Sequence, residues 1–210
     1  MIDLPSEFVV PEKQETGPEL STFSSNEPYK FYKFGNFEAE ISPFIRNAIR
    51  YLKLDEPLNV LDIPSGFGRH SLYFASIGHR VVSGDLDCKR LDFALNRWNN
   101  FNTTRLGVIM PVLLNAEAEL PFEIAVFDLV IVVHSLIPNL IQRVAGHVRP
   151  GGFLLFETVG FQGHNCVTLP KKGESTRGLE DFIIKFIRER PNKKNNDNRV
   201  SVQLIAQKLF

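Results

Sequence analysis

The sequence is poor in the features that mark secreted, metal-binding and membrane-spanning proteins. It has two cysteines among 210 residues, Cys88 and Cys166, and their separation fits neither a metal site nor a redox motif. So few cysteines are typical of reduced thiols in a cytosolic protein. No apolar run reaches the ~18 residues that a membrane-spanning helix needs, and the acidic start of the chain is unlike a secretory signal. We therefore expect a cytoplasmic protein without membrane contact.

The chain also lacks an excess of charge of either sign. Its 24 Lys and Arg residues balance 24 Asp and Glu residues, which argues against a large electrostatic contribution to nucleic-acid binding. Residues 1–28 are acidic and residues 171–199 are basic on balance, and we interpret both as solvated surface. The five histidines show no spacing typical of a metal site. We expect no nucleic-acid partner and no bound metal.

The most informative stretch is residues 60–71, where an apolar run ends at a Gly-x-Gly turn and a helical pattern begins. Gly66 and Gly68 lack Cβ, so the backbone can turn sharply and a ligand can approach the N–H groups of the following helix. Asp62 can accept hydrogen bonds from this loop or from an ammonium group. A purely geometric role for the glycines is the alternative. Asp85 favours a nucleotide pocket, because it lies 19 positions after Gly66, where a strand-end acid binds ribose hydroxyls.

Apolar periodicity along the chain predicts alternating helices and strands. The expected helices cover residues 42–52, 69–77, 87–98 and 136–148, and the expected strands cover 58–63, 80–85, 108–114, 124–133 and 153–157. Ser42 is suited to cap the first helix and Pro43 to begin its first turn. Pro111 removes a ladder donor, which favours a sheet edge for its strand.

The two ends of the chain differ from this alternating pattern. Residues 1–28 combine Pro, Ser, Thr and Glu without a sustained period, which indicates an irregular arm. Residues 182–190 and 199–209 alternate with a period of two and are joined by a polar loop. We expect these two segments to form an antiparallel hairpin.

Four segments, taken in order, resemble the motifs of class I S-adenosylmethionine-dependent methyltransferases, and the resemblance covers residues 38–210. Residues 60–71 resemble the family's Asp-x-Gly-x-Gly-x-Gly loop, and residues 81–87 resemble its ribose-binding strand end. Residues 115–128 resemble its adenine loop with a Phe-Asp strand start, and residues 148–158 resemble its Arg-Pro-Gly-Gly turn. The resemblance implies an α/β, Rossmann-like, seven-stranded and mostly parallel sheet of order 3-2-1-4-5-7-6, with helices on both faces and an antiparallel terminal hairpin. A nicotinamide-binding Rossmann domain is the alternative, but it expects a glycine where Ser71 stands and gives no reason for the hairpin.

The resemblance further implies S-adenosylmethionine as cofactor and S-adenosylhomocysteine as product. Pro64 departs from the family pattern, which usually has a glycine there, and Asn115 replaces a common Asp. Asn115 can still accept a hydrogen bond through its amide oxygen. The implied cofactor-binding residues are Asp62, Ser65, Gly66 and Gly68 for the methionine part, Asp85 for the ribose, Leu86, Asn115 and Ala116 for the adenine, and His134 at the end of the fourth strand.

The acceptor pocket is expected at the carboxyl ends of the first, fourth and fifth strands, where the sheet order reverses. This places His134, Glu157 and His164 near the acceptor as candidate catalytic residues. His134 has the pKa range of a general base, and the alternative is a plain hydrogen bond at a strand end. Methyl transfer depends mainly on positioning, so the resemblance implies no obligatory catalytic side chain.

Residues 29–37 are too aromatic for a free tail. We expect residues 1–37 to form an N-terminal arm that ends in an aromatic lid over the acceptor pocket, and residues 38–210 to form the methyltransferase domain. The alternative is that these aromatic rings simply cover the helix that begins at Ser42.

The predicted function is methyl transfer to a small-molecule acceptor, because residues 134–137 lack the Asn/Asp-Pro-Pro-Tyr pattern of similar enzymes that act on nucleobase or glutamine amides. The alternative is a cofactor-binding, catalytically degenerate protein that acts through a partner, a hypothesis motivated by Pro64 and Asn115. The sequence leaves the acceptor and the oligomeric state open.

Overall fold

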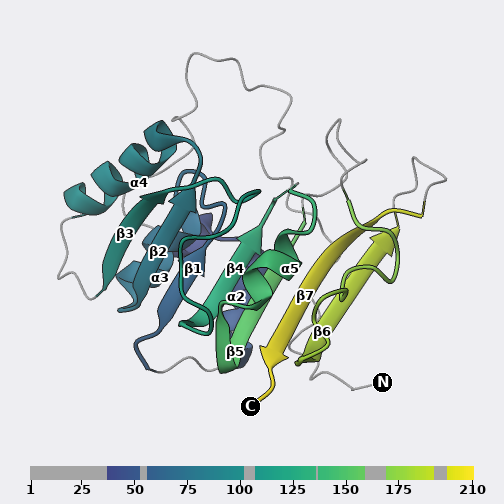
Figure 1. The fold of residues 1–210 in the computed structure, drawn as a ribbon. Helices are drawn as coiled ribbons and strands as arrows, with labels where there is room; N and C mark the ends of the chain where they lie inside the picture. Colours follow the sequence, from purple (N-terminus) through teal and green to yellow (C-terminus); the bar gives the residue numbers. More distant parts are fainter. Residues whose placement is uncertain (1–36, 53–55, 102–106, 136, 159–168, 192–197) are drawn as a thin grey trace.

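The computed structural model describes residues 37–52, 56–101, 107–135, 137–158, 169–191 and 198–210. These residues form one α/β layer structure (Figure 1). Its elements in chain order are α1 (Phe37–Glu40), α2 (Pro43–Leu52), β1 (Asn59–Asp62), α3 (Arg69–Ser76), β2 (Arg80–Asp85), α4 (Cys88–Asn100), β3 (Val108–Leu113), β4 (Phe127–Val133), α5 (Leu140–Ala145), β5 (Val148–Glu157), β6 (Phe182–Pro191) and β7 (Val200–Lys208). None of the described helices is long and apolar enough to cross a membrane.

The strands form one seven-stranded sheet of order β3-β2-β1-β4-β5-β7-β6, which confirms the predicted topology. Strands β1 to β5 pair in parallel, and β7 pairs antiparallel with both β5 and β6. The hairpin predicted from the period of two is therefore β6 and β7. β3 lies at one edge of the sheet, as expected for a strand that contains Pro111.

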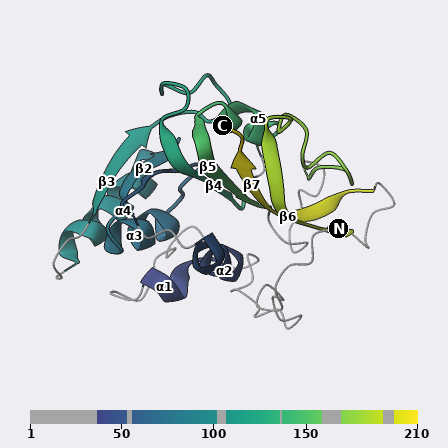
Figure 2. The same cartoon turned by 90° about the horizontal axis from the view of Figure 1, so that it is seen from below.

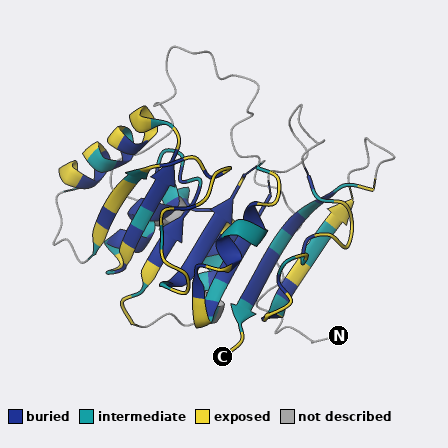
Figure 3. Ribbon diagram, in the orientation of Figure 1, coloured by how far each residue is buried: buried dark blue, intermediate teal, exposed yellow. Residues whose placement is uncertain are grey.

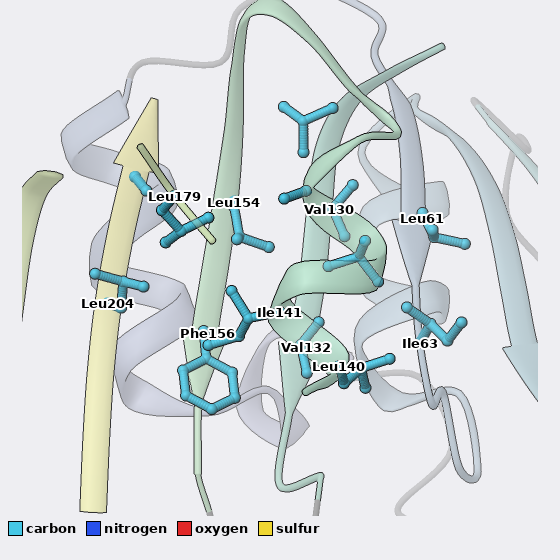
Figure 4. Close-up of a cluster of buried hydrophobic side chains, with 14 of the residues drawn as sticks. Leu61, Ile63, Val130, Val132, Leu140, Ile141, Leu154, Phe156, Leu179 and Leu204 are labelled. Carbon is cyan, nitrogen blue, oxygen red and sulfur yellow. The ribbon is translucent and has the colours of Figure 1, made fainter. Parts of the chain in front are cut away.

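Two apolar layers cover the two faces of the sheet. Helices α1 to α4 lie on one face and α5 lies on the other (Figure 2). Alternate residues of β4 supply the two layers: Leu129 and Ile131 pack toward α2 and α3, while Val130 and Val132 pack toward α5 (Figure 4). Every residue of β4 is consequently buried (Figure 3), as expected for a central parallel strand covered on both faces.

The helix predicted for residues 136–148 is shorter in the structure, where α5 begins at Leu140 and ends at Ala145. Asn139 has φ 58°, a left-handed conformation that cannot continue a helix toward its N-terminus. After the helix, the chain turns at residues 146 and 147 and enters β5 at Val148, five residues before the predicted start of that strand. Apolar periodicity alone did not show either boundary.

Phe37 is the one residue of the predicted aromatic lid that the structure describes. It is buried in the layer of α1 to α4, with its ring centroid 4.6 Å from that of Phe101. Phe37 therefore belongs to the core. Residues 29–36, which carry the rest of the lid prediction, lie outside the described residues.

A buried ion pair attaches α1 to α4. Both terminal nitrogens of Arg97 bond the carboxylate of Glu40, at 2.9 and 2.7 Å. The Arg97 guanidinium also lies over the rings of Phe37 and Phe93, at 5.3 and 5.9 Å from their centroids. The side chain of Arg97 is only 3% exposed, so the ion pair with Glu40 compensates a buried charge.

Replacement of Glu40 by alanine is expected to lower the free energy of unfolding by about 3–5 kcal/mol, because the buried charge of Arg97 would lose the carboxylate that accepts two of its hydrogen bonds. Urea denaturation followed by circular dichroism measures this loss. The double variant Glu40→Ala, Arg97→Met is the control and should lose less. A loss below about 1 kcal/mol in the single variant, as for an exposed pair, would contradict this assignment.

Candidate functional site

The candidate site lies where the carboxyl ends of four parallel strands meet. Asp62 ends β1, Asp85 ends β2, His134 follows β4 and Glu157 ends β5. β1 pairs with β2 on one side and with β4 on the other, so the sheet order reverses between β1 and β4. Ligands of open α/β sheets bind at such a reversal. The fold therefore brings together the strand-end residues that the sequence predicted.

The loop after β1 depends on its two glycines for different reasons. Gly66 has φ 57° and Gly68 has φ 73°, conformations that other residues rarely adopt. A Cβ added to Gly68 would lie 2.5 Å from the Cβ of Ala94, so Gly68 allows the loop to pack on α4. A Cβ added to Gly66 would meet nothing within 4 Å. The space beside Gly66 is open to a ligand.

Asp85 holds the glycine loop from the neighbouring strand. Its Oδ2 accepts the N–H of Gly66 at 2.8 Å, and its Oδ1 accepts the N–H of Asp87 at 3.0 Å. The N–H of Ser65 also donates to the carbonyl of Gly84 at 2.8 Å. The loop after β1 and the turn after β2 are thus one hydrogen-bonded unit, and each carboxylate oxygen keeps further capacity to accept a hydroxyl.

Asp62 is a buried acid with a perturbed pKa. Its Oδ2 accepts two hydrogen bonds from Ser71, from the N–H at 3.0 Å and from the hydroxyl at 2.6 Å. Burial raises the pKa of Asp62 to about 6, although the Ser71 hydrogen bonds and the charge of Arg69 oppose the rise. Ser71 thus has a side-chain role at the position where a nicotinamide-binding Rossmann domain expects glycine. An ammonium group near Asp62 would favour its ionised form.

His134 contacts Arg69, the first residue of α3. The Nη2 of Arg69 lies 3.0 Å from Nδ1 of His134. Arginine only donates hydrogen bonds, so Nδ1 accepts and the proton of the neutral ring is on Nε2. Desolvation, together with the charge of Arg69, lowers the pKa of His134 to about 4, while 44% of the side chain stays exposed. In this arrangement His134 offers the N–H of Nε2 as a donor. A role as general base stays a prediction, and it would require Arg69 to release Nδ1.

Glu157 connects β5 to two other elements. One carboxylate oxygen accepts the hydroxyl of Ser42, and the other accepts Nε2 of Gln203 in β7 at 2.8 Å. The Ser42 hydroxyl in turn accepts the N–H of Phe44 at 3.1 Å, which confirms Ser42 as the cap of α2. Burial raises the pKa of Glu157, against the opposing effects of Ser42, Gln203 and Arg69. With both oxygens engaged, Glu157 is suited to position α2, and its catalytic role stays a prediction.

The residues predicted for the adenine lie next to Asp85. The N–H of Leu114 donates to the carbonyl of Asp85 at 3.0 Å, which brings the end of β3 to the same edge. Leu86 is 67% exposed and offers an apolar surface there. Asn115 is exposed, and its Oδ1 already accepts the N–H of Glu117 at 2.9 Å, while Ala116 is buried. Asn115 therefore keeps one lone pair on its amide oxygen for the predicted adenine contact.

Arg69 is the site residue that the sequence reasoning missed. Its charge affects Asp62, His134 and Glu157, which come from three different strands. The available signal was its place directly after Gly68, at the first turn of the helix that follows the glycine loop. His164 lies outside the described residues. The described part of the chain has no group of three or more residues that could hold a metal ion.

Comparisons with known proteins agree with this geometry. Residues 61–156 match the family model of a methyltransferase domain. No curated protein has a matching sequence.

Solved structures with the same fold include three bacterial and archaeal proteins. A SAM-dependent methyltransferase from Methanosarcina mazei has a TM-score of 0.57 at 21% identity, covering 81% of this chain and 99% of that one. A putative methyltransferase from Bacillus halodurans has a TM-score of 0.62 at 16% identity, covering 81% and 100%. TehB from Haemophilus influenzae has a TM-score of 0.58 at 17% identity, covering 78% of this chain and 62% of that one. At these identities the similarity establishes the fold.

The two loop glycines should respond differently to alanine. Gly68→Ala is expected to lower the free energy of unfolding by about 2–5 kcal/mol, because left-handed strain adds to a collision with Ala94. Gly66→Ala introduces the left-handed strain alone and should lower the free energy of unfolding by about 1–2 kcal/mol. Urea denaturation of both variants measures the difference. Equal losses would show that close packing on α4 does not require Gly68.

Proposed function

We propose that this chain, whose residues 61–156 match the family model of a methyltransferase domain and whose sheet has the Rossmann-like order, transfers a methyl group from S-adenosylmethionine to a small-molecule acceptor. The observation that carries the proposal is the hydrogen-bonded unit of the glycine loop and Asp85 beside the reversal of sheet order. This unit leaves open space at Gly66. Such a loop next to a strand-end acid suits a nucleoside.

The residues present fit this cofactor. The hydroxyl of Ser65 is buried and has no hydrogen-bond partner among the described residues, so it is available to a polar ligand in the loop. Asp62 can compensate an ammonium group, and Asp85 can accept ribose hydroxyls. We assign Asp62, Ser65, Gly66 and Gly68 to the methionine part, Asp85 to the ribose, and Leu86, Asn115 and Ala116 to the adenine.

When bound, S-adenosylmethionine supplies a methyl group on a sulfonium. The part of this chain is to hold the acceptor in line and to exclude water from the pocket. His134 contributes a donor at the end of β4, and Glu157 fixes the start of α2. These roles are positional, so the proposal requires no side chain to form a bond with the acceptor.

The acceptor is proposed to be a small molecule. At the end of β4, where similar enzymes have the Asn/Asp-Pro-Pro-Tyr pattern, the hydroxyl of Ser135 accepts the N–H of Ile137 at 3.2 Å. The chain has a formal net charge of zero, which gives no support to a nucleic-acid partner. We propose a cytoplasmic location, on the sparse cysteines, and no membrane partner.

The alternative, a cofactor-binding protein without activity, is less well supported. Its strongest argument is that Nδ1 of His134 and both carboxylate oxygens of Glu157 are already engaged. Transfer from a sulfonium depends mainly on positioning, so these contacts are compatible with activity.

Titration calorimetry with S-adenosylmethionine and S-adenosylhomocysteine tests the proposal. Both ligands are expected to bind with dissociation constants of tens of micromolar or lower. No binding in this range would refute the enzyme hypothesis. Mass spectrometry of a metabolite extract incubated with the protein and S-adenosylmethionine detects methylated products. Cofactor binding without any such product would favour the alternative.

Asp85→Ala is expected to weaken binding of S-adenosylmethionine by roughly 1–3 kcal/mol, because it removes the acceptor assigned to the ribose hydroxyls. Asp92→Ala, which removes an exposed carboxylate from α4, is the matched control and should bind as the wild type does. Calorimetry on variants with native circular dichroism spectra measures both. An unchanged affinity in folded Asp85→Ala would contradict the ribose assignment.

The affinity for S-adenosylhomocysteine should rise with pH. The pKa of Asp62 is raised to about 6, so below that pH the ligand's ammonium group meets a protonated acid. Between pH 5 and pH 7 the affinity should increase about tenfold, since one proton is released on binding below the pKa. The free α-amino group stays protonated throughout this range.

Asp62→Asn isolates this effect from the other charged or titratable side chains at the edge, which include Arg69, Asp85, Arg90, His134 and Glu157. The affinity of Asp62→Asn should vary little over the same range. A wild-type affinity that is constant from pH 5 to pH 7 would contradict the assignment of Asp62 to the ammonium group.

A further inference from the structure

The sheet ends at β6, and one side of this strand has no partner strand in the described part of the chain (Figure 1). On β7, the carbonyl of Val202 accepts the N–H of Thr158 at 3.0 Å, so the even-numbered residues of β7 direct their backbone groups toward β5. The β6 residues opposite those positions direct their backbone groups the other way, to the open edge. They are Ile184, Ile187 and Glu189.

The side chains along this strand are apolar and cationic. Ile183 and Ile187 are 43% and 42% exposed. Lys185, Arg188 and Arg190 are the cations of β6, and none of the three has an ion pair with another described residue. Unpaired cations are a common feature of edge strands that must not pair with copies of themselves.

The one acid of β6 does not neutralise these cations, because other groups bind it. Glu189 accepts the hydroxyl of Ser175 and the N–H of Gly173, both from the segment before the strand. Burial and the charge of Arg190 lower the pKa of Arg188, as expected for neighbouring cations. The edge is therefore cationic and open to backbone hydrogen bonds.

Residues 1–28 carry the opposite charge. They contain one cation, Lys13, and six acids: Asp3, Glu7, Glu12, Glu15, Glu19 and Glu27. Within them, residues 6–10 read Ser-Glu-Phe-Val-Val, a run of aromatic and β-branched residues that favours a strand. Pro5 and Pro11 limit this run to a short strand, since proline does not donate to a ladder.

The chain is long enough to carry this run to β6. The described structure begins at Phe37, in the layer of α1 to α4. Residues 11–36 can span up to about 85 Å when extended. The two edges of a seven-stranded sheet lie only roughly 29 Å apart at a strand spacing of about 4.8 Å. The other edge strand, β3, has no cationic residue and contains Pro111, so charge selects β6.

We propose that residues 6–10 pair with the open edge of β6 as an additional strand, and that the acids of residues 1–28 face Lys185, Arg188 and Arg190. In such strand addition, main-chain hydrogen bonds supply affinity and side chains supply specificity. A second copy of β6 is a poorer occupant, because it would bring two sets of cations together. The docked segment would also protect the edge from pairing with other chains.

Amide hydrogen exchange, followed by NMR on the full chain, tests the added strand. The informative N–H groups are those of Ile184, Ile187 and Glu189, which the sheet itself leaves on the open side. In the wild type these three groups should be protected, because residues 6–10 accept their hydrogen bonds.

The double variant Phe8→Pro, Val9→Pro disrupts the run. Successive residues of a strand face opposite sides, so one of the two prolines removes a donor to β6 in either register. The three amides should then exchange at least about tenfold faster. Thr22→Pro, Phe23→Pro makes the same change outside the run and is the matched control, which should exchange as the wild type does.

A synthetic peptide of residues 1–12 supplies a second measurement. Added to the full-length Phe8→Pro, Val9→Pro variant, it should restore the slow exchange of the three β6 amides. The same peptide with Asp3, Glu7 and Glu12 replaced by lysine should restore it at least about tenfold less well, since its charge repels the edge. Equal action of both peptides would overturn the role of charge in the proposal.

Equal exchange of the three amides in the wild type and in Phe8→Pro, Val9→Pro would overturn the added strand. Light scattering identifies the occupant, and a monomeric wild type with a protected edge is the expected result. A dimer that persists in the double variant would assign the edge to a second copy. A dimer that the double variant dissociates would assign the run to the β6 of a partner copy. Either dimer would overturn docking within one chain.

Discussion

The parallel pairing of β1 with both β2 and β4 is the constraint on which the site depends. The chain leaves β1 toward β2 on one side and returns to β4 on the other, so the connecting segments diverge above the carboxyl ends of the strands. Asp62, Asp85 and His134 are distant in sequence and meet only there. The hydrogen bond from Gly66 to Asp85 then joins the loops of two adjacent strands. This sheet order places the glycine loop beside the acids that end the neighbouring strands.

The same edge buries two carboxylic acids, Asp62 and Glu157, and burial shifts both pKa values upward. The hydroxyl of Ser71 donates a hydrogen bond to Asp62, and the hydroxyl of Ser42 donates one to Glu157. Arg69 lies near both acids without an ion pair to either in the described residues. The edge is therefore a polar surface on which a cationic ligand group would favour the ionised form of the two acids.

The sequence predicted those parts of the fold that local pattern determines. Short-range chemistry predicted a strand from the apolar run of β4, a tight turn from the two glycines, and a helix cap at Ser42. The structure confirms all three. The helix after β4 was predicted too long, because periodicity does not reveal the left-handed backbone at Asn139. Arg69 was missed for a different reason. Its significance comes from side chains on three strands, and only the assembled sheet brings these together.

The hydrogen bond between Ser42 and Glu157 spans 115 positions of sequence. Gln203, in β7, donates to the same carboxylate. The hydrogen bonds that join the cap of α2 to the sheet are therefore complete only when β5 and β7 are paired. During synthesis, which proceeds from the N-terminus, Ser42 is made well before Glu157 and Gln203, so this set of hydrogen bonds forms only after residue 203 exists. Contacts of such long range are characteristic of slow folding. The hydrogen bonds that fix the start of α2 are therefore among the contacts that a large sequence separation delays.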